Sequence, residues 1–294
     1  MGPSMKPGLR FLAISLLTML FALAGTWALV LVLVYNLQDT LIFPVPGGID
    51  RAALDQSAAE LGNTPVDLTA ADGTRLYAWH REAAKPGSCA VLYLHGNAES
   101  VAGTAELGRF VTGRGCDFLA VAYRGYPGSE GHPSEEGLAS DARAAWDWLV
   151  SRGIAPNRIG LHGCSLGGGV AVRLASEVSP GFLVLESTFT SLPDVAAAVY
   201  PFLPVRTLIR PQFPSAARLA KLSLPVLITH SVDDRLIPVS HARALAKAAP
   251  HATYQETAKW GHGVLVLADK SARDLYSAGL AWLGSAERSP SPWP

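Results

Sequence analysis

Residues 159–169 read IGLHGCSLGGG, a short apolar run followed by a serine set among glycines. The run Ile159–His162 has the character of a buried strand, and the residues from Leu166 to Val178 have that of an apolar helix. A serine at such a strand-to-helix turn is held in a strained backbone geometry with its hydroxyl exposed. The stretch therefore makes Ser165 a candidate nucleophile.

Glycines stand two residues before and two residues after this serine, at Gly163 and Gly167. Without side chains there, the strand and the helix can approach each other closely. The amino terminus of the helix also favours negative charge that develops beside Ser165. Because Gly-x-Ser-x-Gly is common by chance, the prediction depends on partners elsewhere in the chain.

A serine hydroxyl is a weak nucleophile near neutral pH, so it needs a base, and the base needs a carboxylate that fixes its tautomer. A strand-like run over residues 224–230 precedes two adjacent acids, Asp233 and Asp234. A last strand-like run over residues 252–257 precedes His262, which lies between two glycines. We expect His262 to be the base, and the residues alone leave the choice between the two acids open. Glu186, at the end of an earlier strand, is expected to be a structural carboxylate under the site.

A tetrahedral intermediate also needs two backbone donors for its oxyanion. The amide of Leu166, directly after the nucleophile, is the expected first donor. The segment LHGNAE, residues 94–99, follows an apolar strand and precedes a helix, as the second donor requires. We assign that donor to Asn97, with Ala98 as the alternative, and expect His95 to shape the loop.

Short strand-like runs alternate with helical segments along the chain, which indicates a mostly parallel sheet covered by helices on both faces. Reactive groups gather at the carboxyl ends of the strands in such sheets, and each motif above follows a predicted strand. The other predicted strands are Leu76–His80, Ala90–Leu94, Phe118–Ala122, Phe182–Glu186 and Val226–His230. The clearest predicted helices are Val101–Arg114, Ser134–Arg152 and Leu166–Val178, with Asp141, Arg143, Asp147 and Arg152 on solvated faces.

The chain divides into an anchor, a connector, one catalytic domain and a tail. Prolines and glycines interrupt residues 36–65, which we interpret as an irregular connector before a domain over residues 66–284. Aromatic residues and prolines break the strand–helix alternation over residues 190–216, which predicts a small lid between strands 6 and 7. Residues 285–294 are rich in Ser and Pro, and we expect them to be disordered.

The run Phe11–Val34 contains no charged residue and would span about 36 Å as a helix, long enough to cross a bilayer. Residues 11–35 are therefore predicted to be a transmembrane helix. Lys6 and Arg10 precede it, so residues 1–10 are expected in the cytoplasm and the catalytic domain on the periplasmic, extracytoplasmic or lumenal side. The alternative is a signal peptide cleaved near residues 22–24.

Composition agrees with a membrane segment, since 49% of the residues are apolar and only 16% are charged. Lys plus Arg equals Asp plus Glu at 24 each, and no basic run follows the amino terminus, which argues against a nucleic-acid partner. Cys89, Cys116 and Cys164 are odd in number and widely spaced, so we expect buried free thiols. No histidine cluster has ligand spacing, so neither a metal nor another cofactor is predicted.

From Gln38 to about Leu283 the chain resembles the membrane-anchored α/β-hydrolase domain proteins of the serine aminopeptidase and monoacylglycerol-lipase-like branch. The matching stretches are Gln38–Pro44, His95–Glu99, Tyr123–Gly131, Gly163–Gly168 and Asp234–Pro238. The resemblance implies the α/β-hydrolase fold, whose chain order is serine, acid, histidine, and it points to Asp234 because the acid lies four residues before the proline. Ser231 departs from the family, in which a glycine commonly follows the strand histidine. The resemblance gives Arg124 a structural role, in a buried ion pair or loop hydrogen bonds.

Together these features predict a membrane-anchored serine hydrolase that cleaves carboxylic esters through an acyl-enzyme. The apolar lid and the anchor favour a lipophilic small-molecule substrate such as a lipid ester. Thioesters of acylated proteins and peptides are alternative substrates for the same fold. A non-catalytic binding protein is the alternative from another class.

Overall fold

The computed structural model describes residues 6–84 and 88–293, and its strands form one eight-stranded sheet. The strand order is β1-β2-β4-β3-β5-β6-β7-β8, in which β2 runs antiparallel to its two neighbours and the other pairs are parallel. The strands are β1 (Thr64–Thr69), β2 (Arg75–Arg81), β3 (Ala90–Leu94), β4 (Asp117–Ala122), β5 (Ile159–Cys164), β6 (Phe182–Glu186), β7 (Val226–Ser231) and β8 (Thr253–Thr257). The predicted mostly parallel α/β architecture is confirmed.

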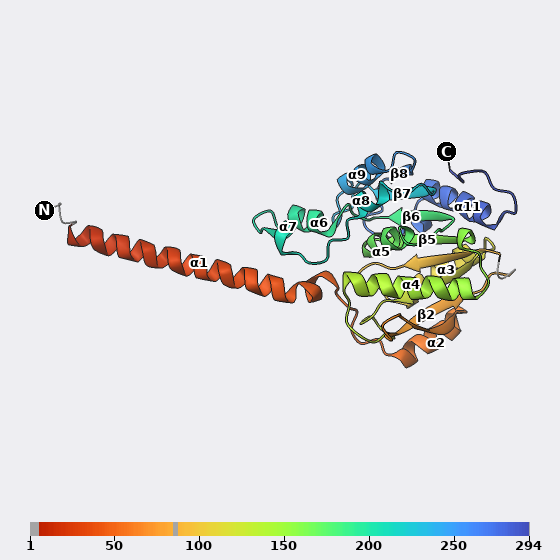
Figure 1. Ribbon diagram of the computed structural model, residues 1–294, viewed down its shortest axis with the longest axis horizontal. Coiled ribbons are helices and arrows are strands. Elements are labelled where there is room, and N and C mark those ends of the chain that lie inside the picture. The colour runs from red at the N-terminus through yellow and green to blue at the C-terminus, as the bar shows by residue number, and fades with distance from the viewer. Residues whose placement is uncertain (1–5, 85–87, 294) are drawn as a thin grey trace.

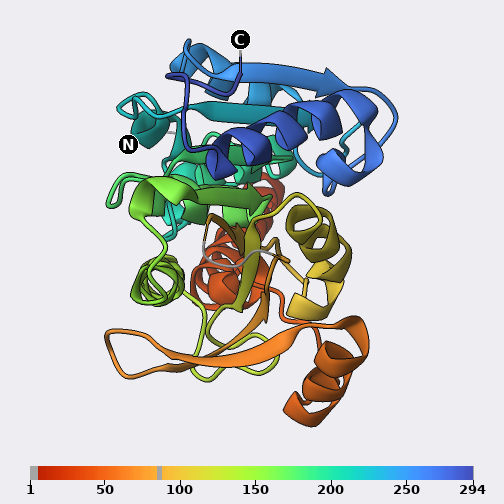
Figure 2. The ribbon, with the colours of Figure 1, turned by 90° about the vertical axis from the view of Figure 1, so that its right-hand side faces the viewer.

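Helices cover both faces of this sheet (Figure 2). The helices of the described chain are α1 (Pro7–Ile42), α2 (Arg51–Leu61), α3 (Ala105–Thr112), α4 (Glu135–Ser151), α5 (Leu166–Ala175), α6 (Leu192–Val199), α7 (Val205–Leu208), α8 (Ser215–Leu219), α9 (Ser240–Ala248), α10 (Leu265–Ala268) and α11 (Lys270–Gly284), with 3-10 turns at Val101–Thr104 and Pro156–Arg158. Helices α3 and α11 lie on one face, and α4 and α5 lie on the other. Because strands β3 to β7 are buried on both faces, their sequences are mostly apolar rather than alternating.

Helix α1 leaves the domain as one straight element (Figure 1). Its 36 residues correspond to about 54 Å, and its apolar window has no buried residue. In the described part of the chain it is the helix long and apolar enough to cross a membrane, although a signal sequence would meet the same criterion. Residues 1–5 of the predicted amino-terminal segment lie outside the described residues.

The predicted irregular connector over residues 36–65 is only partly irregular. Helix α1 continues to Ile42, and α2 occupies Arg51–Leu61 within the same region. The Asp50 carboxylate caps α2 by accepting a hydrogen bond from Ala53 N at 2.7 Å, and Gly62 ends it with a φ of 72°. These cap residues are helix signals that the prolines and glycines upstream obscured. The irregular part is the short stretch between the two helices.

Two cysteines predicted to be free thiols are joined as a disulfide, Cys89–Cys116. Each lies directly before one of two neighbouring parallel strands, β3 and β4, which brings the two Cα atoms to 4.7 Å. A separation of 27 residues along the chain gives no hint of this proximity, because the intervening helix returns the chain to the same edge. Cys164 is a buried free thiol, as expected.

The carboxyl-terminal tail, predicted to be disordered, packs against the domain as far as it is described. The Trp293 side chain is buried, donates its indole N–H to Leu275 O at 2.8 Å and packs against the Phe182 ring. Gly279 of α11 makes room for it, since a Cβ there would lie 2.8 Å from the indole. The prediction of disorder was wrong because it rested on the Ser and Pro content of the tail, whereas one aromatic side chain, Trp293, attaches the tail to the domain.

The segment predicted to be a lid lies between β6 and β7 and contains α6 and α7. Its base is closed by two backbone hydrogen bonds, from Leu192 N to Gln212 O and from Ala216 N to Thr190 O, both 3.0 Å. The two ends of the segment are therefore held together, and the residues between them form one loop. In Figure 1 it projects from the domain on the side where α1 leaves it.

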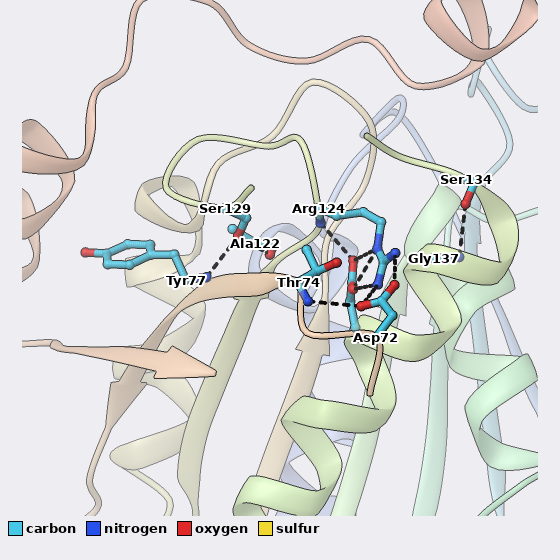
Figure 3. Close-up of polar contacts among 9 residues, drawn as sticks. Asp72, Thr74, Tyr77, Ala122, Arg124, Ser129, Ser134 and Gly137 are labelled. Carbon is cyan, nitrogen blue, oxygen red and sulfur yellow. Dashed lines mark hydrogen bonds and ion pairs between the residues drawn. The ribbon is translucent and has the colours of Figure 1, made fainter. Parts of the chain in front are cut away.

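Arg124, expected in an ion pair, lies between two aspartates (Figure 3). Its guanidinium donates to Asp141 at 2.8 and 2.9 Å and to Asp72 at 2.7 Å, and its backbone N–H donates to Asp141 at 2.8 Å. Asp141 had been expected on a solvated face, but its side chain is fully buried. The sequence could not reveal the burial of Asp141, because its partner Arg124 lies outside α4, the helix that contains Asp141.

We predict that Arg124→Met destabilises the fold by about 3–5 kcal/mol, because it leaves the Asp141 carboxylate buried without a counter-ion. Arg143→Met is the matched control, because Arg143 pairs with Asp147 on the exposed surface of α4, the helix that also contains Asp141. That change should alter the free energy of unfolding by less than about 1 kcal/mol. Urea unfolding measures both values, and equal losses would contradict the buried pair.

Candidate active site

Ser165 lies at the turn between β5 and α5, with φ of 53° and ψ of −118°. This backbone geometry costs about 1–3 kcal/mol and persists only where neighbours hold it. Here the Ser165 N–H donates to Glu186 O at 2.9 Å, and the Ser165 carbonyl accepts from Thr188 Oγ1 at 2.7 Å. Both contacts come from β6 and the residues after it, so the neighbouring strand fixes the serine.

The glycines around this turn have no room for a side chain. A Cβ on Gly163 would lie 2.3 Å from Gly167 O, and one on Gly167 would lie 1.9 Å from Leu94 O at the end of β3. The reason proposed from the sequence therefore applies to both positions. A Cβ on Gly96 would lie 3.2 Å from Ser165 Cβ, which shows that the loop after β3 lies directly against the serine.

Asp234 and His262 are joined by a hydrogen bond of 2.8 Å between Asp234 Oδ2 and His262 Nδ1. The other oxygen, Oδ1, accepts from Leu236 N at 2.8 Å and from Ile237 N at 2.9 Å. Burial raises the pKa of Asp234, but hydrogen bonds from His230, His262 and Ile237 outweigh it and hold this pKa well below its usual range. Asp234 is therefore an ionised acceptor fixed on both sides.

Asp233, the adjacent acid, has different contacts. Its Oδ1 accepts from Ser231 Oγ at 2.5 Å and from Gly261 N at 2.9 Å. Ser231 Oγ in turn accepts from Trp260 N at 3.1 Å. Asp233 and Ser231 thus fix the backbone before His262, whereas Asp234 contacts the imidazole itself. Ser231, the departure from the family pattern, has a role in this loop.

The loops that carry Ser165 and His262 meet through Ser187, which directly follows β6. Ser187 Oγ donates to Gly263 O at 3.0 Å, next to His262, while the preceding residue, Glu186, accepts from Ser165 N. Strands β5, β6, β7 and β8 are consecutive in the sheet and parallel, so their carboxyl ends share one edge. The candidate nucleophile, acid and base therefore lie at the same edge.

The Glu186 side chain has partners other than Ser165, Asp234 and His262. It is fully buried and accepts hydrogen bonds from His162 Nε2 at 2.6 Å and from Val266 N at 2.8 Å. These contacts tie β5 and β6 to the start of α10 beneath the edge. The expectation of a structural carboxylate agrees with this placement.

One expected oxyanion donor, Leu166, directly follows Ser165, and the other, Asn97, belongs to the loop after β3 that lies against Ser165. The amide of Leu166 is the first of α5, so it has no partner within the helix. In the loop after β3, Ala98 N donates to Pro44 O at 3.1 Å and is already engaged. Ala98 is thus the weaker of the two alternatives in this loop, and Asn97 stays the expected donor.

The Asn97 side chain is held by a segment that sequence reasoning did not assign to the site. Asn97 Nδ2 donates to Ile42 O at 2.6 Å, and Asn97 Oδ1 accepts from Tyr126 Oη at 3.0 Å. Together with the bond from Ala98 to Pro44, this ties the loop after β3 to the end of α1. The sequence did contain a signal for this contact, because residues 38–44 form one of the stretches that resemble the family.

Glu99 is a second residue that sequence reasoning left without a role. Its carboxylate is largely buried and accepts from Gly96 N at 2.8 Å. Burial raises the pKa of Glu99, against the opposing effects of that hydrogen bond and of charge on His262. Glu99 therefore fixes the backbone of the loop that lies against Ser165.

His95 packs at the base of this loop as a neutral ring. Its ring lies 4.3 Å from that of Tyr123 and 4.9 Å from that of Tyr126, between centroids, and its Nδ1 lies 2.8 Å from Gly96 O. Its Nε2 has no hydrogen-bond partner within the described residues. Burial lowers the pKa of His95 to about 4. This placement agrees with the expected loop-shaping role.

No metal site is formed by the described side chains. Among residues 6–84 and 88–293, no group of three or more His, Cys, Asp or Glu residues is arranged to hold an ion.

No protein-family model matches the chain, whereas several known proteins are similar to it in sequence. The uncharacterized protein Rv2307c of Mycobacterium tuberculosis is 41% identical over 223 residues, which cover 75% of this chain and 78% of that protein. The alpha/beta hydrolase domain-containing protein WAV2 of Arabidopsis thaliana is 32% identical over 248 residues, covering 74% and 79%. The human protein ABHD12B is 35% identical over 196 residues, covering 59% and 53%.

Solved structures with a similar fold include enzymes. The Vibrio vulnificus alpha-beta hydrolase superposes with a TM-score of 0.67 at 24% identity, covering 94% of this chain and 95% of that one. The Pyrococcus furiosus esterase Pf2001 superposes with a TM-score of 0.62 at 20% identity, covering 77% and 93%. At these identities the likeness establishes the fold, and the similar sequences establish the relationship.

We predict that acid weakens the fold through His95, because the unfolded chain takes up a proton near pH 6.5 that the native chain binds only near pH 4. The contribution of the neutral, buried His95 to the free energy of unfolding is therefore fully present above pH 6.5. It is lost as the pH drops towards 4, by about 3 kcal/mol in total. The measurement is urea unfolding across this range.

His95→Gln removes the titrating ring, so its stability relative to wild type should improve as the pH falls. His132→Gln changes an exposed histidine and serves as the control. A difference between wild type and His95→Gln that does not vary with pH would contradict the prediction.

Proposed function

This chain belongs to the α/β-hydrolase family, and from that premise we propose that it is a serine hydrolase that cleaves carboxylic esters. Ser165 is the nucleophile, His262 is the general base and Asp234 orients it. The observation that carries the proposal is the 2.8 Å hydrogen bond from His262 Nδ1 to a buried, ionised Asp234, at the edge where the strained turn places Ser165. The relationship supports a hydrolase, and this pair of side chains supports the serine mechanism.

The reaction proceeds in two acyl transfers. The Asp234 carboxylate accepts a hydrogen bond from Nδ1–H of His262, which holds the tautomer whose Nε2 is free to remove the proton from Ser165 Oγ. Ser165 Oγ attacks the ester carbonyl, and the amides of Leu166 and Asn97 stabilise the oxyanion. His262 then returns the proton to the leaving alcohol as the acyl-enzyme forms. Water, activated by the same histidine, attacks the acyl-enzyme and releases the acid.

We assign the substrate to lipophilic esters such as lipid esters. Helix α1 would hold the domain at a membrane, where such substrates are concentrated. The segment between β6 and β7 adds large apolar side chains exposed to solvent, including Tyr200 and Phe202. Both features support a substrate drawn from lipid.

In this proposal α1 is a single membrane span, with the amino terminus in the cytoplasm and the domain on the other side. Lys6 and Arg10 before the span support that orientation. The Cys89–Cys116 disulfide supports it independently, because structural disulfides persist in oxidising compartments outside the cytoplasm.

A fluorophosphonate probe tests the nucleophile, since it phosphonylates activated serines. We expect one label on the wild-type protein and none on Ser165→Ala. Ser176→Ala, at the other end of α5, is the matched control and should be labelled like wild type. Folded wild-type protein that takes up no label would refute the serine mechanism and favour a non-catalytic binding protein.

Exchanging each adjacent acid for its amide tests the orienting role. Asp234→Asn should lower kcat for a short p-nitrophenyl ester by roughly 10⁴-fold, because the amide favours the wrong tautomer of His262. Asp233→Asn leaves the hydrogen bond between Asp234 and His262 in place and should lower kcat far less. The reverse ranking would place the acid at position 233.

A further inference from the structure

The turn between α6 and α7 exposes a cluster of large apolar side chains, Val199, Tyr200 and Phe202, called here the apolar turn. Their exposed fractions are 55%, 56% and 88%, and Phe202 is the most exposed large apolar side chain in the described part of the chain. Such a cluster on a projecting loop is costly in water and marks a contact surface.

The neighbouring end of α1 restricts what can cover the apolar turn. Gln38 of α1 is buried, with 3% of its surface exposed, and forms hydrogen bonds with the end of α7 and with the segment that follows it. Its Oε1 accepts from Arg210 N at 2.7 Å, and its Nε2 donates to Leu208 O at 3.3 Å. Asp39 adds an ion pair to Arg210 at 2.6 Å. The lid segment is therefore attached to α1 itself.

The point of attachment lies at the end of the apolar part of α1. The uncharged run Phe11–Val34 ends four residues before Gln38, or about 6 Å along the helix axis. The guanidinium of Arg210 lies 5.2 Å from the ring centroid of Tyr35, the first residue after that run. If the run fills the hydrocarbon core, Arg210 and Tyr35 lie at the level of the lipid head groups.

The lid segment is also oriented towards the side on which α1 leaves the domain. Figure 1 shows α6 and α7 projecting beyond the sheet on the side towards which α1 extends, above the last turns of that helix. The apolar turn thus projects towards the plane that α1 enters. Tyrosine and arginine are suited to that depth, because each has an apolar body and a polar end.

We propose that the apolar turn docks on the surface of the bilayer that α1 spans, with Val199, Tyr200 and Phe202 in its interfacial layer. Gln38 is the positioning residue that fixes the lid segment at this depth. The proposal rests on α1 being a membrane span, and it does not depend on the catalytic assignment. Its consequence is that the lid next to the candidate active site borders lipid rather than bulk water.

The test uses the full-length protein in phosphatidylcholine vesicles with an environment-sensitive fluorophore on one introduced cysteine. Cys164 is buried and the other two cysteines are paired, so the new thiol is the reactive one. Phe202→Cys reports the apolar turn, and Leu23→Cys reports the middle of α1. Ser151→Cys is the control, because it lies at the exposed end of α4, before β5 begins at the opposite edge of the sheet.

Nitroxide-labelled phosphatidylcholine should quench the fluorophore at positions 202 and 23 and leave position 151 bright. Quenching at position 23 alone would overturn the docking while keeping the membrane span. Loss of quenching at both positions would overturn the span and the docking together. Blue-shifted but unquenched emission at position 202 would place the turn against protein, such as a second copy, and would also overturn the proposal.

Gln38→Ala tests the positioning role in the same vesicles. We expect weaker quenching at position 202 and unchanged quenching at position 23, because the lid segment loses its attachment while the span remains. Circular dichroism checks that the variant is folded. Unchanged quenching at position 202 in a folded variant would remove Gln38 from the account.

Discussion

The close approach of α5 to the ends of β3 and β5 is the constraint on which the site depends. Gly167 lies so near the carbonyl of Leu94 that no side chain fits between them. At the turn between β5 and α5, Ser165 has a positive φ that its hydrogen bonds with Glu186 and Thr188 hold, and the amide of Leu166 comes next. The loop after β3, which carries Asn97, also lies against the serine. The candidate nucleophile and both candidate oxyanion donors therefore lie around one packing contact.

The parts of this arrangement that follow from local pattern could be predicted from the sequence. The strand, glycines and helix around Ser165 lie within twenty residues, and the apolar central strands had nearly correct bounds. Pairings between distant segments could not be predicted in this way. The Cys89–Cys116 disulfide depends on two strands being neighbours, and the burial of Asp141 depends on an arginine outside its helix. Trp293 likewise finds its site only in the folded domain.

The end of helix α1 is part of the folded domain, while the rest of the helix extends from it. Its last residue accepts a hydrogen bond from Asn97, and Pro44 accepts one from Ala98, so the end of the helix supports the loop beside Ser165. Gln38 joins the same end to the lid segment. A membrane span that also supports the loop and the lid would fix the site at a set height above the bilayer.

The most direct test of the account is to find which residue carries the acyl group during turnover. A p-nitrophenyl ester would be mixed with the enzyme, quenched in acid within one turnover, and the peptides analysed by mass spectrometry. The account predicts one acyl group per chain, on the peptide that contains Ser165 and at that serine. An acyl group on another residue, or turnover of the ester with no acylated peptide, would contradict it.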